Sequence, residues 1–230
     1  MSKRLKIQTD TFEYISSKKN PARALRRKFR KKFADGFLSG LTTMLGPEDV
    51  CIDCGANIGE ISSILGVTGA TIHAFEPDPF AFGMLEKSCG YLKNVHLYNA
   101  AVGTESGKID LYRRGAFEDD PEWLSLSSST VGDSKRNPGH QAVSVDVIDL
   151  SSFIKEILKT KEKIAFLKID IEGAELEILE RFVETDILTN IKKTAVEIHP
   201  WMFKDGKKRF AALQKLADDK PEFNLNLQWY

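Results

Sequence analysis

A short apolar segment that turns sharply into a helix constrains the fold of this chain more than any other feature. Residues 50–60 read VCIDCGANIGE, so an apolar run ends at Asp53 and a Gly-x-Asn-x-Gly turn follows. The pattern predicts a strand, a tight turn and the start of a helix, which is where open α/β sheets bind small ligands. Gly55 and Gly59 lack a Cβ, so we expect the backbone to bend here and to lie close to a ligand. Asp53, at the carboxyl end of the strand, is expected to face that ligand.

Three kinds of ligand loop and an ordinary strand-to-helix turn compete for this segment. A dinucleotide loop has glycine at its first, third and sixth positions, but here those positions hold Gly55, Asn57 and Glu60. A P-loop ends in Gly-Lys-Ser/Thr, and that ending is absent here. S-adenosylmethionine (SAM) carries no phosphate and presents an ammonium, a sulfonium and a ribose, so an acidic loop suits it better than it suits a phosphate. The loop alone leaves SAM binding and a plain turn open.

A second predicted strand, residues 71–76, also ends in an acid, Glu76. A carboxylate at this position can accept hydrogen bonds from both hydroxyls of a ribose. NAD and SAM both contain a ribose, so Glu76 alone does not distinguish them. Asp78 and Pro79 suit the N-cap and the first turn of the next helix, which is predicted at 79–91.

A third strand-to-helix transition carries two closely spaced acids. Residues 164–169 form a mostly apolar run, Asp170 and Glu172 follow it, and 173–183 has the apolar spacing of a helix. One polar residue is enough to cap a helix, so two acids at the end of a buried strand indicate a binding or catalytic site.

Segments spread over about residues 48–200 resemble, in order and spacing, the signatures of the FkbM family of SAM-dependent methyltransferases. The segments are DCGANIG at 53–59, FEPDP at 75–79, NAAVG at 99–103, the Ser-rich SLSSST at 125–130, LKIDIEGAE at 167–175 and VEIH at 196–199. The resemblance implies the α/β class I methyltransferase fold, a Rossmann-like three-layer sandwich with a mostly parallel central sheet. It also implies SAM as cofactor and, most often, O-methylation of a sugar hydroxyl in a glycan, a glycolipid or a glycosylated metabolite.

The resemblance and the predicted strand ends together nominate the site residues. Those expected to bind SAM are Asp53, Gly55, Ala56, Asn57, Gly59, Glu76, Pro77, Asn99, Ala100, Ala101 and Asp170. The three candidates for accepting the proton of an acceptor hydroxyl are Asp170, Glu172 and His199. No metal ligands are assigned, although some O-methyltransferases hold a divalent cation among acids of this region. Methyl transfer to a nitrogen or a non-sugar hydroxyl, and a binding protein that catalyses no transfer, remain as alternatives.

Residues 1–46 are expected to form a basic helical arm ahead of a methyltransferase domain at 47–230. Residues 18–32 hold nine Lys or Arg and no acid, which leaves the rest of the chain with 24 basic and 33 acidic residues. An apolar stripe at helical spacing accompanies this charge: Ala22, Leu25, Phe29 and Phe33. The helix either docks its stripe on the domain or contacts an anionic membrane surface or an acidic glycan. Nucleic acid is not an expected partner, because no aromatic platform accompanies the basic run.

The cysteine count and the hydropathy bear on the compartment. Three cysteines, an odd number, argue against a disulfide framework and for a reducing compartment. No run approaches 18 apolar residues, and residues 1–10 lack the apolar core of a signal peptide. We therefore expect a cytoplasmic protein, peripheral at the inner membrane surface if the basic arm binds lipid.

The rest of the pattern predicts a sheet that departs from the full class I arrangement at its C-terminal edge. Further elements are expected as strands at 95–99 (running on into 100–103), 193–198 and 222–229, an antiparallel pair at 108–113 and 142–146 around a polar loop at 115–140, and helices at 150–158 and 207–217. A full class I sheet has seven strands, the last two forming an antiparallel hairpin. Only one predicted strand follows His199.

Overall fold

The computed structural model describes residues 21–112, 142–227 and 229. The predictions for the first 20 residues and for the long polar loop with its Ser-rich segment lie outside the described residues. Within the described ranges, none of the helices is both long enough and apolar enough to cross a bilayer.

The chain divides into two units, and the smaller one contains residues 1–43 and 229–230. Its described part is the helix α2 (Pro21–Thr42) and Trp229. Pro21 is the first residue of α2, and proline suits a first turn because it has no N–H to leave unpaired there. The ring of Trp229 meets that of Phe37 edge-on, with 5.7 Å between the ring centroids.

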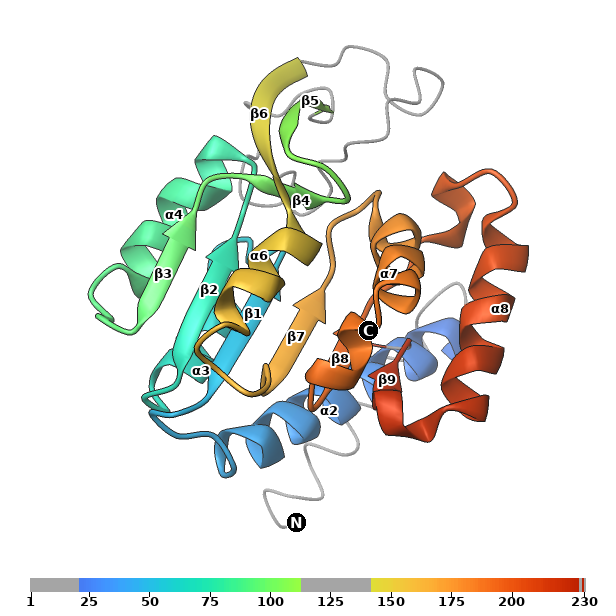
Figure 1. The fold of residues 1–230 in the computed structure, drawn as a ribbon, viewed down its shortest axis with the longest axis horizontal. Helices are drawn as coiled ribbons and strands as arrows, with labels where there is room; N and C mark the ends of the chain where they lie inside the picture. The colour runs from blue at the N-terminus through green and yellow to red at the C-terminus, as the bar shows by residue number, and fades with distance from the viewer. Residues whose placement is uncertain (1–20, 113–141, 228, 230) are drawn as a thin grey trace. The chain divides into compact units, whose positions relative to one another are not determined.

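A six-stranded parallel sheet forms the centre of the larger unit, residues 44–228 (Figure 1). In order across the sheet, the strands are β3 (Val95–Tyr98), β2 (Thr71–Phe75), β1 (Val50–Cys54), β7 (Phe166–Ile169), β8 (Thr194–Val196) and β9 (Leu225–Asn226). Every neighbouring pair is parallel. β1 is buried at all five positions, which explains why its sequence is almost continuously apolar rather than alternating.

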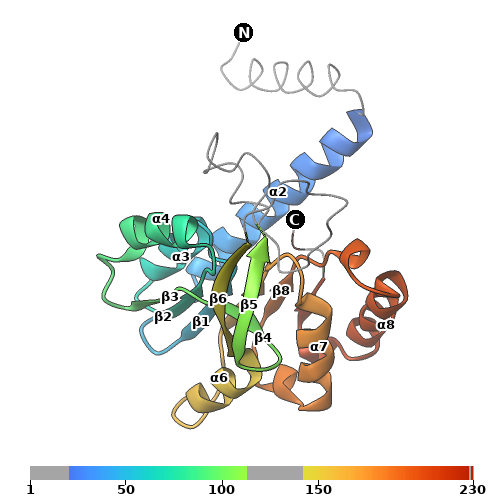
Figure 2. The same cartoon turned by 90° about the horizontal axis from the view of Figure 1, so that it is seen from above.

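Helices cover both faces of this sheet (Figures 1 and 2). On one face lie α3 (Glu60–Gly66) and α4 (Pro79–Cys89), and on the other α6 (Leu150–Ile157) and α7 (Glu175–Glu184). Leu150 of α6 and Leu179 of α7 belong to one buried cluster with Ile52 and Ile169 of the sheet. The layers and the parallel strands confirm the predicted α/β class I fold.

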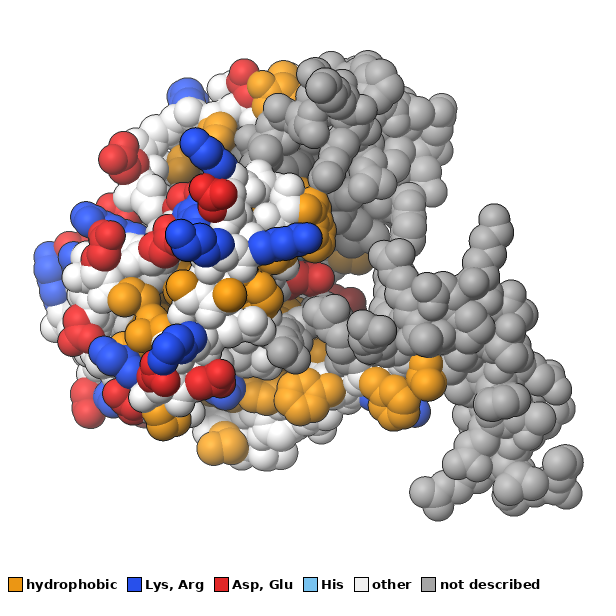
Figure 3. Space-filling view, turned by 90° about the vertical axis from the view of Figure 1, so that its right-hand side faces the viewer, with side chains coloured by type: hydrophobic (Ala, Val, Ile, Leu, Met, Phe, Trp, Pro, Cys, Tyr) orange, Lys and Arg blue, Asp and Glu red, His pale blue; other side chains and the backbone are white. Residues whose placement is uncertain are grey.

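The helix α8 (Gly206–Asp219) lies beside α7, and salt bridges join the two helices. Arg209 of α8 pairs with Glu177 and Glu180 of α7 at N···O distances of 3.1 and 2.6 Å. The face of the molecule that carries α8 mixes basic and acidic side chains (Figure 3). This face therefore presents charges of both signs rather than a field of one sign.

A second, three-stranded sheet packs its own small core. β6 (Ala142–Asp149) pairs parallel with β4 (Ala101–Gly103) and antiparallel with β5 (Gly107–Tyr112). The antiparallel pair was predicted, but residues 100–103 were expected to run on from the third strand of the main sheet. They form a separate strand instead, and Ala101 packs with Leu111 in the small core.

The C-terminal strand is shorter than predicted. Pro221 opens a 3-10 turn, η4 (Pro221–Phe223), and Asn224 has a left-handed φ of 47°, so extended backbone begins only at β9. β9 pairs parallel with β8. Among the described residues the main sheet thus has six parallel strands and no antiparallel hairpin at this edge.

Gly59 is needed for helix packing. Its φ is 93°, and an added Cβ would lie 2.8 Å from Leu85 Cδ1 and 2.9 Å from Cys89 Sγ, both on α4. Gly59→Ala should therefore lower the free energy of unfolding by roughly 1–3 kcal/mol, through left-handed strain and overpacking.

Gly83 of α4 is the matched control, because an added Cβ meets nothing within 4 Å there. Gly83→Ala should be neutral or stabilise the protein by up to about 1 kcal/mol. Urea unfolding of both variants is the measurement, and equal effects would refute the packing role of Gly59.

Candidate active site

A cavity opens at the carboxyl ends of the parallel strands, the edge at which open α/β sheets bind ligands. Residues of β4 and β5 complete its wall. The lining residues are Gly55, Asn57, Phe75, Glu76, Pro77, Ala100, Ala101, Val102, Leu111, Asp170, Ile171, Glu172, Ala174 and Glu197.

The loop after β1 is wedged between β2 and β7. The N–H groups of Gly55 and Ala56 both donate to the carbonyl of Phe75, at 3.0 and 2.9 Å. Gly55 has a φ of 77°, and a Cβ there would lie 1.7 Å from the carbonyl oxygen of Asp170. Only glycine fits, because the backbone of Asp170, just after β7, occupies the space of a side chain.

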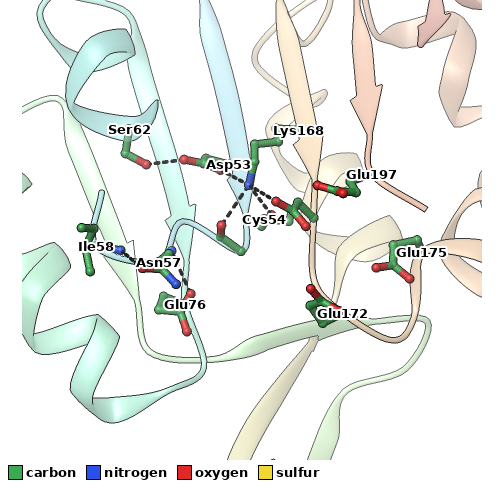
Figure 4. Close-up of polar contacts among 12 residues, drawn as sticks. Asp53, Cys54, Asn57, Ile58, Ser62, Glu76, Lys168, Glu172, Glu175 and Glu197 are labelled. Carbon is green, nitrogen blue, oxygen red and sulfur yellow. Dashed lines mark hydrogen bonds and ion pairs between the residues drawn. The ribbon is translucent and has the colours of Figure 1, made fainter. Parts of the chain in front are cut away.

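Glu76 closes one end of the cavity and is bound by backbone N–H groups (Figure 4). Its Oε2 accepts from the N–H of Asn57 at 2.8 Å, and its Oε1 accepts from the N–H of Asp78 at 2.9 Å. Burial raises the pKa of this carboxyl to about 7, and the hydrogen bonds from Asp78 and Asn57 only partly offset it. Glu76 therefore changes charge near neutral pH.

A buried lysine that was not among the predicted site residues, Lys168, links acids and backbone carbonyls beside the cavity. The Nζ of Lys168 lies 3.2 Å from Asp53 Oδ1 and 3.7 Å from Asp170 Oδ2. It also donates to the carbonyls of Cys54 and Gly55, at 3.3 and 2.9 Å. Burial alone would lower the pKa of Lys168, but the carboxylates of Asp53 and Asp170 outweigh it and hold the pKa above its usual range.

The opposite end of the cavity holds a cluster of acids around His199. Its Nδ1 lies 2.9 Å from Oε1 of the fully buried Glu175, and its Nε2 lies 3.4 Å from Glu172 and 4.0 Å from Glu197. Burial alone would lower the pKa of His199, but Glu175, Glu172 and Glu197 raise it to about 9. A protonated imidazole at neutral pH cannot accept a proton, so these contacts disfavour His199 as the general base.

The structure brings most of the predicted site residues to this cavity. The predicted residues that line it are Gly55, Asn57, Glu76, Pro77, Ala100, Ala101, Asp170 and Glu172. Those that lie outside the lining are Asp53, Ala56, Gly59, Asn99 and His199. Glu197 lines the cavity although it was not chosen as a site residue.

The expected contact of Asp53 with a ligand stays a prediction, and in the structure its side chain does not line the cavity. Asp53 is fully buried, accepts a hydrogen bond from Ser62 at 2.7 Å and pairs with Lys168 (Figure 4). The side chain of Asn99 holds the backbone after β2, because its Nδ2 donates to the carbonyls of Glu76 and Pro77 at 2.9 and 3.2 Å. A lysine inside a buried strand, two residues before an acid, was the signal for Lys168, since such a charge needs partners.

We expect Lys168→Met to lower the free energy of unfolding by about 3–5 kcal/mol, because it leaves the Asp53 carboxylate buried without its partner. Lys192 is the matched control: it pairs with Asp49 at 3.1 Å, but its side chain is 58% exposed. Lys192→Met should cost about 1 kcal/mol or less. Chemical unfolding measures both variants, and similar losses would contradict this view of Lys168.

Comparison with known proteins agrees with this geometry. The model of the methyltransferase FkbM domain matches residues 53–222. "Methyltransferase 1" of Beauveria bassiana (strain ARSEF 2860) is 27% identical over 191 residues, which cover 76% of this chain and 72% of that protein. The 31-O-demethyl-FK506 methyltransferase FkbM of Streptomyces tacrolimicus is 28% identical over 197 residues, covering 74% of this chain and 73% of that one.

Among solved structures, an rRNA methylase from Streptococcus thermophilus aligns with a TM-score of 0.40 and 12% identity, covering 78% of this chain and 75% of that one. The family match spans most of the chain and includes the cavity loops after β1, β2, β7 and β8. The chain therefore belongs to the FkbM methyltransferase family, and it is a methyltransferase.

Proposed function

We propose that this methyltransferase transfers the methyl group of SAM to a hydroxyl oxygen of a sugar-containing acceptor, in a glycan, a glycolipid or a glycosylated metabolite. The observation that carries the proposal is a single cavity with Glu76 at one end and the acids Asp170 and Glu172 at the other. The ribose of SAM suits Glu76, and the methionine end with its sulfonium suits the acidic end.

The chemistry asks little of the protein beyond alignment and proton transfer. The sulfonium of SAM makes its methyl group electrophilic, so the protein must place an acceptor oxygen in line with the methyl carbon and the sulfur. A sugar hydroxyl also needs a proton acceptor. Asp170 and Glu172 line the cavity, and their side chains are 27% and 28% exposed. This access to the cavity supports the proposal that one of the two accepts that proton.

An oxygen acceptor is also favoured by one relative. The protein from Streptomyces tacrolimicus is named for 31-O-demethyl-FK506, which describes transfer to an oxygen. We extend the oxygen, and not that compound, to this chain.

Binding of SAM should depend on pH through Glu76. The ribose hydroxyls donate to the charged carboxylate, so binding favours the deprotonated form of a group whose pKa is about 7. Affinity should be full above pH 8 and fall about tenfold on lowering the pH to 6. In Glu76→Gln the affinity should be weaker and this pH dependence lost. Calorimetry measures both proteins, and NAD binding tighter than SAM would refute the cofactor assignment.

Transfer should depend on the charge of Asp170. Incubation with methyl-labelled SAM and fractionated cell-envelope glycans should label a sugar-containing species. Asp170→Asn keeps the shape but removes the charge, so the rate should fall by about 10²–10⁴ while SAM affinity changes only a few-fold. Label on a nitrogen, or on a molecule without a sugar, would show that the acceptor belongs to another class than the one proposed. A rate close to that of the wild-type protein would remove Asp170 from catalysis.

We also propose that α2 binds an anionic membrane surface. The side chains of Leu25, Phe29 and Phe33 recur at intervals of four along the helix and are 43%, 64% and 62% exposed. In the sequence, residues 18–32 include nine Lys or Arg and no acid. Basic charge with exposed aromatic residues is the pattern of helices that lie in a membrane interface.

A vesicle assay tests this proposal. The protein should sediment with phosphatidylglycerol vesicles but not with phosphatidylcholine vesicles, most strongly at low salt. A Phe29→Ser, Phe33→Ser double variant should lose most of this binding. The control is Val67→Ser, because Val67 is 72% exposed and lies outside α2. Unchanged binding of the double variant would favour a helix that only docks.

A further inference from the structure

Three potential metal ligands meet at the ends of two adjacent strands. Asp170 follows β7, Glu197 follows β8, and His199 lies two residues further. The pairing of Ile169 with Val196 sets Asp170 and Glu197 side by side. One ligand atom from each of the three side chains lies within 4.8 Å of the others.

The imidazole of His199 is oriented by a buried carboxylate. Its Nδ1 contacts Glu175 Oε1 at 2.9 Å, and Glu175 is fully buried. When Nδ1–H donates a hydrogen bond to Glu175, a neutral ring has its lone pair on Nε2. That nitrogen faces Glu172 and Glu197. A carboxylate behind a histidine in this way is the usual support of a metal-binding imidazole.

The cluster also has an open side. Asp170 and Glu197 line the cavity, whereas His199 is 4% exposed and is not among the lining residues. Ligands on a divalent cation at about 2.1 Å are roughly 3–4 Å apart, so small side-chain rotations would close the set. Two carboxylates with one imidazole suit cations of the manganese class, which accept mixed oxygen and nitrogen ligands.

We infer that Asp170, Glu197 and His199 bind one divalent cation, with Mn²⁺ as the representative ion, and that Glu175 is its positioning residue. The role of this cation in methyl transfer rests on the proposed function. A cation here would hold the acceptor hydroxyl near the methyl group and ease loss of its proton. The binding itself stands or falls without any acceptor.

Mn²⁺ binding to the SAM-free protein, measured by electron paramagnetic resonance of the free ion, is the test. The wild-type protein should bind one Mn²⁺, and its pulsed spectrum should show coupling to an imidazole nitrogen. Glu197→Gln and His199→Gln should each weaken binding at least about tenfold, and His199→Gln should remove the nitrogen signal. Glu175→Leu should weaken binding by about 10–100-fold, as for other supports of a metal ligand.

Asp110→Asn is the matched control, because Asp110 is an exposed acid of β5 outside the cluster, and it should bind Mn²⁺ as the wild type does. Thermal melting shows which variants fold, and if one does not, the nitrogen signal of the wild-type protein decides the question. A folded wild-type protein that binds no Mn²⁺, or unchanged binding in Glu197→Gln and His199→Gln, overturns the inference: the acids then only hold a protonated His199. Methyl transfer that proceeds without a bound cation would leave the proposed function intact, whereas Mn²⁺ binding without methyl transfer would leave only the cation site.

Discussion

The ammonium of Lys168 holds together the parts on which the cavity depends. It is buried in β7, and its partners come from the neighbouring strand β1, from the loop that follows that strand and from Asp170. A buried charge is tolerated only where its hydrogen bonds and ion pairs are satisfied, so these partners fix one another. Gly55 and Asp170 are also in direct backbone contact, since a side chain at Gly55 would strike the Asp170 carbonyl. The loop expected to face the cofactor and the acid expected to act in transfer are therefore set by one arrangement.

The two ends of the cavity differ in chemistry, and under the proposed function that difference would set the orientation of SAM in the cavity. Glu76 is buried and held by two backbone N–H groups, which suits recognition of a neutral ribose. The other end concentrates Asp170, Glu172 and Glu197 around the buried His199. Negative charge there favours a sulfonium, an ammonium or a metal cation, and it disfavours a phosphate. A cation bound among these acids would take the place of the proton on His199 Nε2, and the Glu175 carboxylate at Nδ1 would then orient the ring as a ligand.

The sequence predicted the local features well, because strand, turn and helix patterns depend on near neighbours. The apolar run that begins at Val50 was predicted as a strand, and β1 is found there; Asp78 caps α4 as expected. The roles of Asp53 and Lys168 were missed because their contact joins strands far apart in the chain, and periodicity carries no such information. Gly59 was expected to let the backbone lie close to a ligand. The structure adds a second reason for glycine at this position, because a side chain would collide with α4. The last strand was predicted to be too long, because its expected first residues belong to the 3-10 turn that begins at Pro221.

A crystal structure with S-adenosylhomocysteine tests the central claim most directly, because that claim is about where the two ends of the cofactor lie. We expect the ribose hydroxyls within hydrogen-bond distance of the Glu76 carboxylate, and the sulfur directed toward Asp170 at the acidic end of the cavity. A ligand bound elsewhere, or one whose ribose lies at the Asp170 end, would contradict the account.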